Sequence, residues 1–298
     1  MGWRIVYIEE SEYLSLYLDN IKIKRNDNDV TIPLSDIHSL IIDNYKSMLS
    51  VNLLNKCSEE KINVVLCGID HMPKTIITPV SGNNQSPKML QTQISWGEKI
   101  KEEIQRIIIV GKIENQNQVL EKHHKNPDVI KKIEFFKNET LPGDPGNREG
   151  LSAKMYFREL FGDDFTRFDD DSINSGLNYG YEILRSQISK VLISRGLNPA
   201  IGIFHRGAEN CFNLSDDIIE VFRPIIDDYV FQHLSKKDLF TREHRLSLIK
   251  LTTKSMLYSK ERQTLFNVIN LYVNSILDCL NFGVLKEIEI PRFKDFLI

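Results

Sequence analysis

The sequence contains few cysteines, and none of them stands in a metal-binding or redox motif. The four are Cys57, Cys67, Cys211 and Cys279, and no two form a Cys-x-x-Cys pair. Zinc ribbons and disulfide-rich scaffolds need clustered cysteines, so this spacing argues against both. We expect reduced thiols in the core of a cytoplasmic protein.

Long apolar segments are lacking as well. The N-terminus reads MGWRIVYIEESEY, with no basic stretch ahead of an extended apolar one, so we expect no signal peptide. The longest apolar runs, such as residues 107–110, are far too short to cross a bilayer, and we expect no membrane association. No GxxxxGK[ST] loop is present, so nothing points to a nucleotide-driven reaction.

An excess of positive charge is absent overall but present locally. The chain carries 38 Lys and Arg against 41 Asp and Glu, a net charge of −3. Residues 236–262 hold eight basic and three acidic residues, a local balance of +5. Such a strip can bind phosphates even in an acidic chain, although charge alone favours a solvated helix face. The candidate DNA contacts in this strip are Arg242, Arg245, Lys250 and Lys254.

The length of 298 residues suits two domains, and the residue patterns differ along the chain. Residues 1–78 predict a β-rich domain, with a hairpin around Asp19-Asn20, a helix over 48–57 and a buried strand over 62–67. A stretch rich in Pro, Gly, Ser and Asn marks a linker over 79–89. Beyond it the apolar spacing is helical. The fold class is therefore α+β, a small β-rich domain followed by a larger all-α domain over 90–298. The expected helices cover residues 90–110, 147–160, 177–194, 215–231, 240–256 and 261–281.

Three segments of the second domain could carry chemistry. Glu149 falls in the first turn of a helix, where an acid is favoured by the helix dipole, but the dipole does not explain the adjacent Gly150. His205 follows an apolar run, and taken alone it is most simply a core or surface histidine. In residues 216–229, Asp217, Glu220 and Asp228 share one helix face with a proline, either as an exposed acidic stripe or as a cation site.

Two carboxylates and an imidazole would suit a divalent ion with open coordination positions, either Mg²⁺ or Mn²⁺. On these grounds alone the set is one candidate among several. Another is the acidic run over 163–171, which lacks the glycine and the distal glutamate of a calcium loop and is interpreted as a solvated loop with helix-capping acids.

The order of motifs over residues 146–231 resembles the CRISPR-associated integrases that acquire new spacers, the proteins numbered one in that system. The motifs are Gly-Asn-Arg-Glu-Gly at 146–150, Ile-Asn-Ser-Gly-Leu-Asn-Tyr-Gly-Tyr at 173–181, Gly-Leu-Asn-Pro at 196–199 leading into Gly-Ile-Phe-His at 202–205, and Asp-Ile-Ile-Glu-Val-Phe-Arg-Pro at 217–224. The overall character of the chain is most similar to the version found in type II systems, with type II-A as the expected subtype.

The resemblance implies a role for each matching position. Glu149, His205 and Glu220 match the family's catalytic metal ligands, although many members have aspartate where this chain has Glu220. Asp217 would be a further ligand or a supporting partner, and Arg223 would form a structural ion pair. Residues Asn178 and Tyr179 would line the site.

The resemblance also implies the reaction and the partners. The 3′-hydroxyl of a prespacer DNA would attack a phosphodiester at the leader and repeat of a CRISPR array, with Mg²⁺ or Mn²⁺ as cofactor. The protein would form a homodimer through its β-rich domain and a heterohexamer with the small partner numbered two, with other type II adaptation proteins as further partners.

Two other functions stay open. A metal-dependent nuclease that uses water in place of the 3′-hydroxyl would need the same three ligands. A non-catalytic scaffold that binds DNA or protein through residues 236–262 would keep its activity when Glu149 is replaced by alanine.

Overall fold

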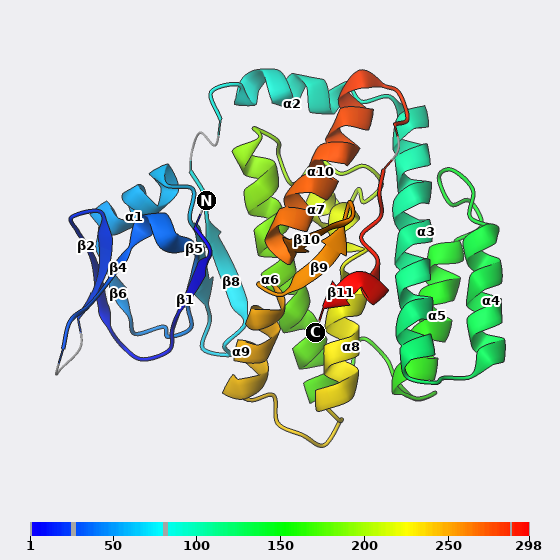
Figure 1. The fold of residues 1–298 in the computed structure, drawn as a ribbon, viewed down its shortest axis with the longest axis horizontal. Helices are drawn as coiled ribbons and strands as arrows, with labels where there is room; N and C mark the ends of the chain where they lie inside the picture. The colour runs from blue at the N-terminus through cyan, green and yellow to red at the C-terminus, as the bar shows by residue number, and fades with distance from the viewer. Residues whose placement is uncertain (1, 25–27, 80–82, 287, 298) are drawn as a thin grey trace. The chain divides into compact units, whose positions relative to one another are not determined.

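A computed structural model describes residues 2–24, 28–79, 83–286 and 288–297 of the protein. The chain divides into two compact units, Met1–Ser86 with Ile193–Gly196, and Pro87–Leu192 with Leu197–Ile298. Strands come first and helices dominate afterwards, which confirms the α+β class (Figure 1). Residues 80–82 of the predicted linker lie outside the described residues, and helix α2 (Ser86–Ile94) begins within that linker.

Two four-stranded sheets make up most of the first unit (Figure 1). One has the order β1 (Arg4–Ile8), β5 (Ile37–Ile42), β7 (Asn63–Cys67) and β8 (Pro73–Ile77). The other has the order β4 (Val30–Pro33), β3 (Asn20–Lys24), β2 (Tyr13–Tyr17) and β6 (Met48–Leu49). Strands β1, β5 and β7 run parallel, whereas β8 is antiparallel to β7 and was not predicted.

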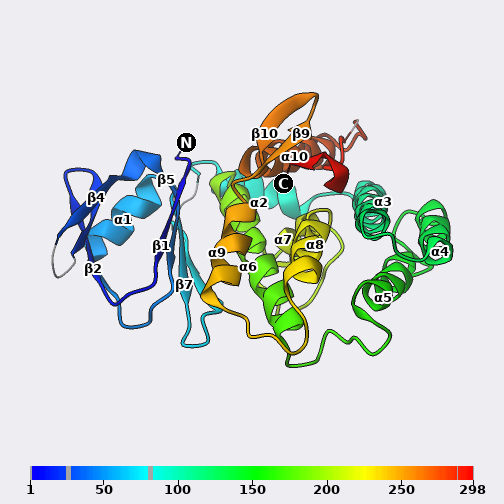
Figure 2. The same cartoon turned by 60° about the horizontal axis from the view of Figure 1, so that its bottom comes forward.

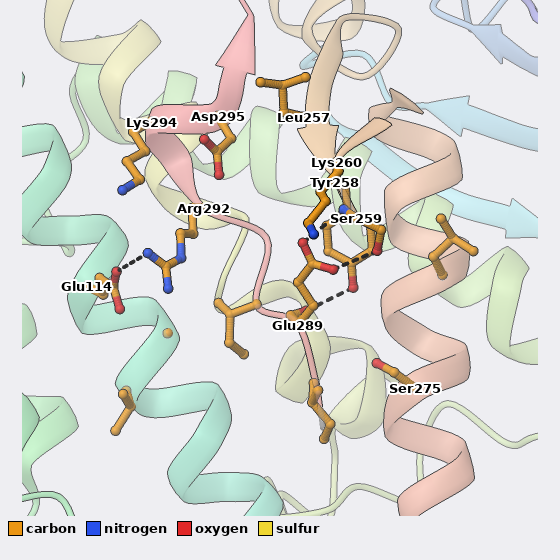
Figure 3. Close-up of a pocket in the computed structure, with 15 residues that line it drawn as sticks. Glu114, Leu257, Tyr258, Ser259, Lys260, Ser275, Glu289, Arg292, Lys294 and Asp295 are labelled. Atoms are coloured by element: carbon orange, nitrogen blue, oxygen red, sulfur yellow. Dashed lines mark hydrogen bonds and ion pairs between the residues drawn. The ribbon is translucent and has the colours of Figure 1, made fainter. Parts of the chain in front are cut away.

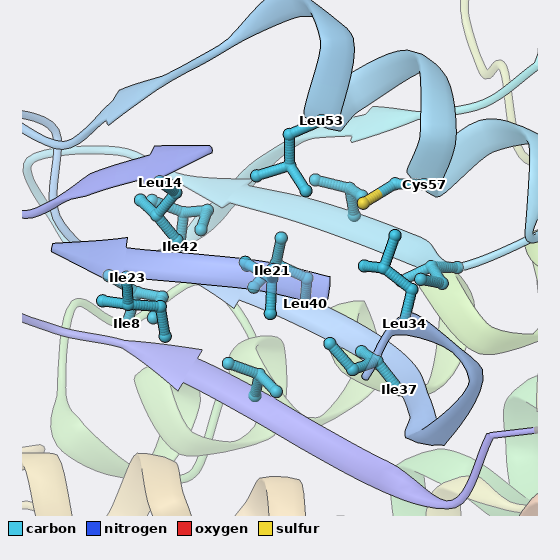
Figure 4. Close-up of a cluster of buried hydrophobic side chains, with 13 residues drawn as sticks. Ile8, Leu14, Ile21, Ile23, Leu34, Ile37, Leu40, Ile42, Leu53 and Cys57 are labelled. Carbon is cyan, nitrogen blue, oxygen red and sulfur yellow. The ribbon is translucent and has the colours of Figure 1, made fainter. Parts of the chain in front are cut away.

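The core of this unit follows from strand alternation. In β3, Ile21 and Ile23 are buried while Lys24 is exposed, as expected for a half-buried strand. Strand β5 is buried along its whole length because it has a parallel neighbour on each side. Helix α1 (Val51–Glu59) points Leu53 and Cys57 into the cluster of buried apolar side chains that contains Ile21 and Ile23 (Figure 4).

The predicted hairpin forms, but its turn lies one residue earlier than expected. Tyr17 pairs with Asn20, so the two turn residues are Leu18 and Asp19, with φ of 45° and 56°. Two consecutive positive φ values define the tight turn whose twist matches that of paired strands. The side chain of Asn20 supports the turn by donating to the carbonyl oxygens of Leu18 and Tyr17.

The rest of the described chain is mainly helical, and α3, α4 and α5 lie side by side in both views (Figure 1, Figure 2). No helix among the described residues is long and apolar enough to span a membrane. The helices after α2 are α3 (Glu98–Lys122), α4 (Pro127–Asn138), α5 (Arg148–Phe161), α6 (Ser172–Ser194), α7 (Asn213–Ile219), α8 (Arg223–His233), α9 (Arg242–Leu251) and α10 (Leu265–Phe282).

Two predicted helices are each divided in two. The helix expected over 90–110 breaks before Gly97, and α3 then continues to Lys122. The helix expected over 215–231 breaks at 220–222 into α7 and α8. Pro224 therefore stands in the first turn of α8, where its missing N–H costs no hydrogen bond, and it does not kink a helix interior. This break determines where Glu220 lies.

The C-terminal region is helical, as predicted, but it is not all-α. Strands β9 (Ser255–Tyr258), β10 (Glu261–Thr264) and β11 (Phe296–Leu297) form a small antiparallel sheet. The turn between β9 and β10 consists of Ser259 and Lys260, both with positive φ. Turns of this type favour Gly and Asn, so the sequence carries no clear turn signal here and helices over 240–256 and 261–281 were expected.

The four cysteines, all among the described residues, form no disulfide. Cys57, Cys67 and Cys279 are buried, as predicted. Cys211 is exposed, which corrects the expectation that all four lie in the core. It lies in the loop just before α7, where no apolar pattern surrounds it.

Candidate active site

Glu149 lies in the first turn of α5, and another acid, Asp144, caps the start of this helix. The carboxylate of Asp144 accepts hydrogen bonds from the backbone N–H groups of Arg148 and Glu149 at 2.8 and 3.0 Å. Because Asp144 satisfies these donors, the Glu149 side chain is not needed as a cap. Instead Glu149 Oε1 accepts a hydrogen bond from Lys112 Nζ at 2.7 Å. The helix-dipole explanation therefore does not account for the direction of Glu149.

Gly150 has a local explanation. A Cβ atom at this position would lie 2.6 Å from Oδ1 of Asn147, the residue just before α5. Asn147 itself has a left-handed backbone, with φ of 48°. The glycine thus leaves room for the Asn147 side-chain amide, and a larger residue would have to displace the end of that flexible side chain.

His205 is held by the buried carboxylate of Asp217. Asp217 Oδ1 lies 2.7 Å from His205 Nδ1 and accepts the backbone N–H of His205 at 2.9 Å. Its other oxygen accepts the backbone N–H groups of Ile203 and Phe204. Asp217 has no exposed surface, whereas the His205 side chain is 38% exposed. Because Nδ1 is engaged, Nε2 is the ring nitrogen left for another partner.

Glu220 lies in the break between α7 and α8, next to two cations. Its Oε2 is 2.5 Å from Lys112 Nζ, and its Oε1 accepts a hydrogen bond from Arg223 Nε at 3.0 Å. The Glu220 side chain is only 4% exposed, and that of Lys112 is 11% exposed. Arg223 thus forms an ion pair with an acid, the contact that the resemblance implied for it.

Helix α3 contributes a polar face that the sequence did not reveal as part of the site. Lys112 reaches both glutamates, and Asn115 Nδ2 donates to the carbonyl oxygen of Val221 at 2.7 Å. Gln116 Oε1 accepts a hydrogen bond from Ser152 of α5 at 3.1 Å. Positions 112, 115 and 116 share one helix face, and all three side chains are buried. That buried polar stripe within an isoleucine-rich helix is the signal that could have located Lys112.

The charges of both glutamates affect the pKa of the His205 imidazole. Burial alone would lower the pKa of the His205 imidazole, but the hydrogen bond and charge of Asp217 outweigh burial and raise it. The charges of Glu220 and then Glu149 raise this pKa further. The three residues that the resemblance assigned to the site, far apart in sequence, therefore act on one another electrostatically.

The acids at 217, 220 and 228 do not form the repelling row that a single helix would give. Asp217 binds His205, and Glu220 binds Lys112 and Arg223, whereas Asp228 lies 2.9 Å from Lys122 Nζ. The helix break separates these acids, and each has a cationic or imidazole partner of its own.

His123 is largely buried at the end of α3. Its side chain is 14% exposed and its Nε2 lies 2.7 Å from Asp228 Oδ1. It directly follows α3, whose residues after 110 were not part of the predicted helix. His123 therefore belongs to the contacts that join the end of α3 to α8.

Of the two α6 residues expected to line the site, Tyr179 does not. It is fully buried with its ring 5.5 Å from that of Phe240, while Asn178 is exposed and accepts a hydrogen bond from Arg167. Another α6 residue, Tyr181, does reach the site, and its ring centroid lies 4.5 Å from the Arg223 guanidinium. Tyr179 and Tyr181 are two residues apart and therefore lie on different sides of the helix, so they contact different neighbours.

Tyr181 and Tyr156 both donate to the buried carboxylate of Asp227 on α8. Burial raises the pKa of Asp227 to about 6, and the two tyrosine hydrogen bonds offset part of that effect. The network connects α5, which carries Glu149, to α8, which carries Arg223. It therefore fixes the helices that hold the two sides of the site.

The predicted basic strip is only partly available to a ligand. Arg242, Lys250 and Lys254 are exposed, but Arg245 is 6% exposed and faces the core. Lys236 lies 3.0 Å from the carboxylate of Asp164, which offsets its charge. Arg245 was expected on the surface because its place on the helix face could not be read from charge alone.

A cavity of about 1030 Å³ lies elsewhere in this unit (Figure 3). It is lined by Glu114 and Arg292, which form an ion pair of 3.4 Å, and by Glu289, which accepts hydrogen bonds from Ser259. None of the predicted site residues lines it. The cavity is therefore separate from the candidate active site.

No three His, Cys, Asp or Glu side chains among the described residues are arranged to hold a metal ion. Two carboxylates instead share the ammonium group of Lys112, so a single cation already joins them. Both glutamates keep oxygens for a hard cation, and His205 has Nε2 left after Nδ1 binds Asp217. This donor set fits a divalent ion, provided that Lys112 gives up its position.

The charge cluster makes a prediction about acid stability. Burial would raise the pKa of Glu220, but Arg223 and Lys112 outweigh it and lower this pKa to about 2, from 4.5 when exposed. A depressed pKa gives stability that is fully present above pH 4.5 and lost as the pH falls through about 2. In EDTA, Glu220→Gln should remove a contribution on the order of 3 kcal/mol at neutral pH. Urea unfolding over this pH range would show the wild type converging on the variant; parallel curves would contradict the prediction.

A strand-rich unit is followed by a helical unit, in which Glu149 and Glu220 contact the same lysine and their charges act on His205 in a nearby loop. Residues 5–257 match the sequence profile of the family described as CRISPR associated protein Cas1, so the chain belongs to this family. A CRISPR-associated endonuclease Cas1 of Neisseria meningitidis serogroup C (strain 8013) is 34% identical over 296 residues, covering 98% of this chain and 97% of that protein.

Solved structures share the fold at low sequence identity. A casposase bound to its integration product is 19% identical with a TM-score of 0.75, covering 98% of this chain and 96% of the casposase chain. A chain of a Cas6-RT-Cas1–Cas2 complex is 18% identical with a TM-score of 0.76, covering 98% of this chain and 36% of that one. These similarities extend the fold assignment to nearly the whole chain.

Proposed function

We propose that this protein is a metal-dependent DNA integrase of CRISPR spacer acquisition, which joins prespacer 3′-ends to the CRISPR repeat. The observation that carries the proposal is the convergence of Glu149 and Glu220 on one cation, with His205 in their electrostatic field. A solvated acidic face would not gather these groups from three separate segments. Membership of the Cas1 family and the casposase-like fold support the same reaction class.

The metal would be held by the carboxylates of Glu149 and Glu220 and by Nε2 of His205. Bound there, Mg²⁺ or Mn²⁺ would supply positive charge to the phosphate under attack. Asp217 keeps the imidazole in one orientation and one tautomer through Nδ1. Arg223, beside Glu220, holds that carboxylate in place.

The proposed reaction exchanges one phosphodiester for another. The 3′-oxygen of the prespacer forms a bond to the phosphorus at the 5′-end of a repeat strand, while the bond from this phosphorus to the 3′-oxygen of the flanking array strand breaks. The proton of the attacking hydroxyl ends on the 3′-oxygen that leaves. Because the number of phosphodiesters is unchanged, no nucleotide hydrolysis is needed, and the reverse reaction should occur.

The proposed partners are prespacer DNA, the leader and repeat of the array, and a Cas2 protein. One structural neighbour is a complex of Cas1 with Cas2, and another is a Cas1–DNA complex with a TM-score of 0.55. By analogy, a homodimer formed through the β-rich unit would assemble with Cas2 into a heterohexamer. Further type II adaptation proteins and the type II-A subtype stay predictions.

A joining assay tests this function against a plain nuclease. Purified protein, its Cas2 partner, a short duplex with labelled 5′-ends and free 3′-hydroxyls, and a repeat-bearing supercoiled plasmid should yield label covalently attached to plasmid. EDTA should abolish the product, and added Mn²⁺ or Mg²⁺ should restore it. Shortened fragments without attached label would identify a nuclease. Full activity of Glu149→Ala would favour the non-catalytic scaffold.

The exposed part of the basic strip should contribute to DNA affinity. Replacing Lys250 and Lys254 by glutamate should weaken binding and flatten its salt dependence, by a slope of about 0.9 for each lost phosphate contact. Fluorescence anisotropy over a salt series would measure both effects. Lys131→Glu with Lys132→Glu, on the exposed side of α4, makes the same charge change as a control. An equal effect of both pairs of substitutions would show that the basic strip is not part of the DNA interface.

A further inference from the structure

Lys112 occupies the point at which the two glutamates meet. Its Nζ lies 2.7 Å from Glu149 Oε1 and 2.5 Å from Glu220 Oε2, so these oxygens are about 5 Å apart at most. The lysine comes from the middle of α3, a 25-residue helix that also fixes the neighbouring Val221 carbonyl through Asn115. Its ammonium group is therefore delivered by a rigid element.

The environment explains why a cation must be there in the metal-free protein. Glu220 is 4% exposed, and a buried carboxylate is strongly unfavourable unless a positive charge compensates it. Arg223 binds one oxygen of Glu220, but Glu149 and the second oxygen of Glu220 face Lys112. Without this ammonium, two like charges would stand close together with reduced access to water.

An ammonium group and a divalent ion cannot share this place. A bound Mg²⁺ or Mn²⁺ draws carboxylate oxygens to roughly 2.1 Å, closer than they lie to Lys112 Nζ, and its charge would repel the ammonium. The lysine must therefore withdraw before both glutamates can bind the same ion. Metal binding then has to overcome the ion pairs that Lys112 makes.

We propose that Lys112 is an internal cation that competes with the divalent metal for Glu149 and Glu220. It stabilises the metal-free protein and weakens metal affinity by the same interactions, and it thereby sets the metal concentration at which the site fills. This positioning role rests on the proposed metal site, because it assumes that the two glutamates are ligands.

The test compares Lys112→Met with Lys122→Met in the full chain. Lys122 lies on the same helix and pairs with Asp228, so its replacement removes one lysine–carboxylate ion pair away from the two glutamates. Electron paramagnetic resonance measures free Mn²⁺ and hence the dissociation constant, and thermal melts in EDTA and in Mn²⁺ measure stability.

We expect Lys112→Met to melt lower than the wild type in EDTA but to bind Mn²⁺ more tightly. The gain should be between about 5-fold and 150-fold, the usual range for coupled binding events. Its melting temperature should accordingly rise more on addition of Mn²⁺. Lys122→Met should also melt lower in EDTA, with the Mn²⁺ affinity of the wild type. Lys112→Arg, which retains the charge, should bind Mn²⁺ no more tightly than the wild type.

Unchanged or weaker Mn²⁺ binding by Lys112→Met, with binding by the wild type intact, would overturn the competition while leaving the metal site in place. If neither the wild type nor Lys112→Met binds Mn²⁺, the proposed metal site itself is wrong. If Lys112→Met does not fold in EDTA, folding on addition of Mn²⁺ supports the proposal, and failure to fold with Mn²⁺ while Lys112→Arg folds overturns it.

Discussion

His205→Ala should abolish DNA joining while leaving the protein folded. The imidazole is the proposed nitrogen ligand, and its side chain is 38% exposed, so its loss removes little packing. Asp217 keeps its hydrogen bonds to the backbone of residues 203–205 in the variant, so the loop should stay in place. We expect joining to fall by more than about 100-fold, since losing even an outer partner of a metal ligand costs up to that factor. The free energy of unfolding should change by less than about 1 kcal/mol.

The measurement pairs the plasmid joining assay with a thermal melt and with DNA binding by anisotropy. His233→Ala is the matched control, because His233 is exposed and its Nδ1 contacts only the Tyr229 carbonyl of its own helix among the hydrogen bonds described. Joining at the wild-type rate by His205→Ala would exclude the imidazole from the site. Loss of joining together with unfolding would mean that His205 is structural.

Asp217→Asn should reduce joining by about 10-fold to 100-fold, by loosening the orientation of His205. The carboxylate accepts three backbone N–H groups and contacts Nδ1 of the imidazole. An asparagine has only one acceptor oxygen, and its NH₂ group would face a backbone donor. Leaving a buried donor unsatisfied should cost about 2 kcal/mol of unfolding free energy.

A double variant separates positioning from general destabilisation. If Asp217 acts on joining through His205, then adding Asp217→Asn to His205→Ala should lower joining no further. Stability should still fall, because the backbone hydrogen bonds are lost regardless of the imidazole. A further multiplicative loss of joining in the double variant would show that Asp217 acts independently of His205, as a direct ligand would.

The sequence was most informative where local rules are strong. The alternation around Ile21 and Ile23, the helix start before Glu149 and the α+β class all follow from residue periodicity and turn residues. The sequence was less informative where contacts between distant segments determine the local structure. The β9–β10 turn at Ser259-Lys260 lacks the residues that such turns favour. The sequence around 220–222 suggests one helix kinked at Pro224, whereas the structure has two helices there.

The order of motifs along the chain identified the family and selected Glu149, His205 and Glu220, because those patterns are local and distinctive. Only the tertiary structure brought in Lys112, since a lysine within a long helix is ordinarily solvated, and the polar stripe that it forms with Asn115 and Gln116 among isoleucines does not by itself show burial. The same is true of Tyr181 and Arg245, whose places at the site and in the core depend on helix phase. Local sequence determines which chemical groups are present, but packing between distant segments determines which of them contact the same charged side chain.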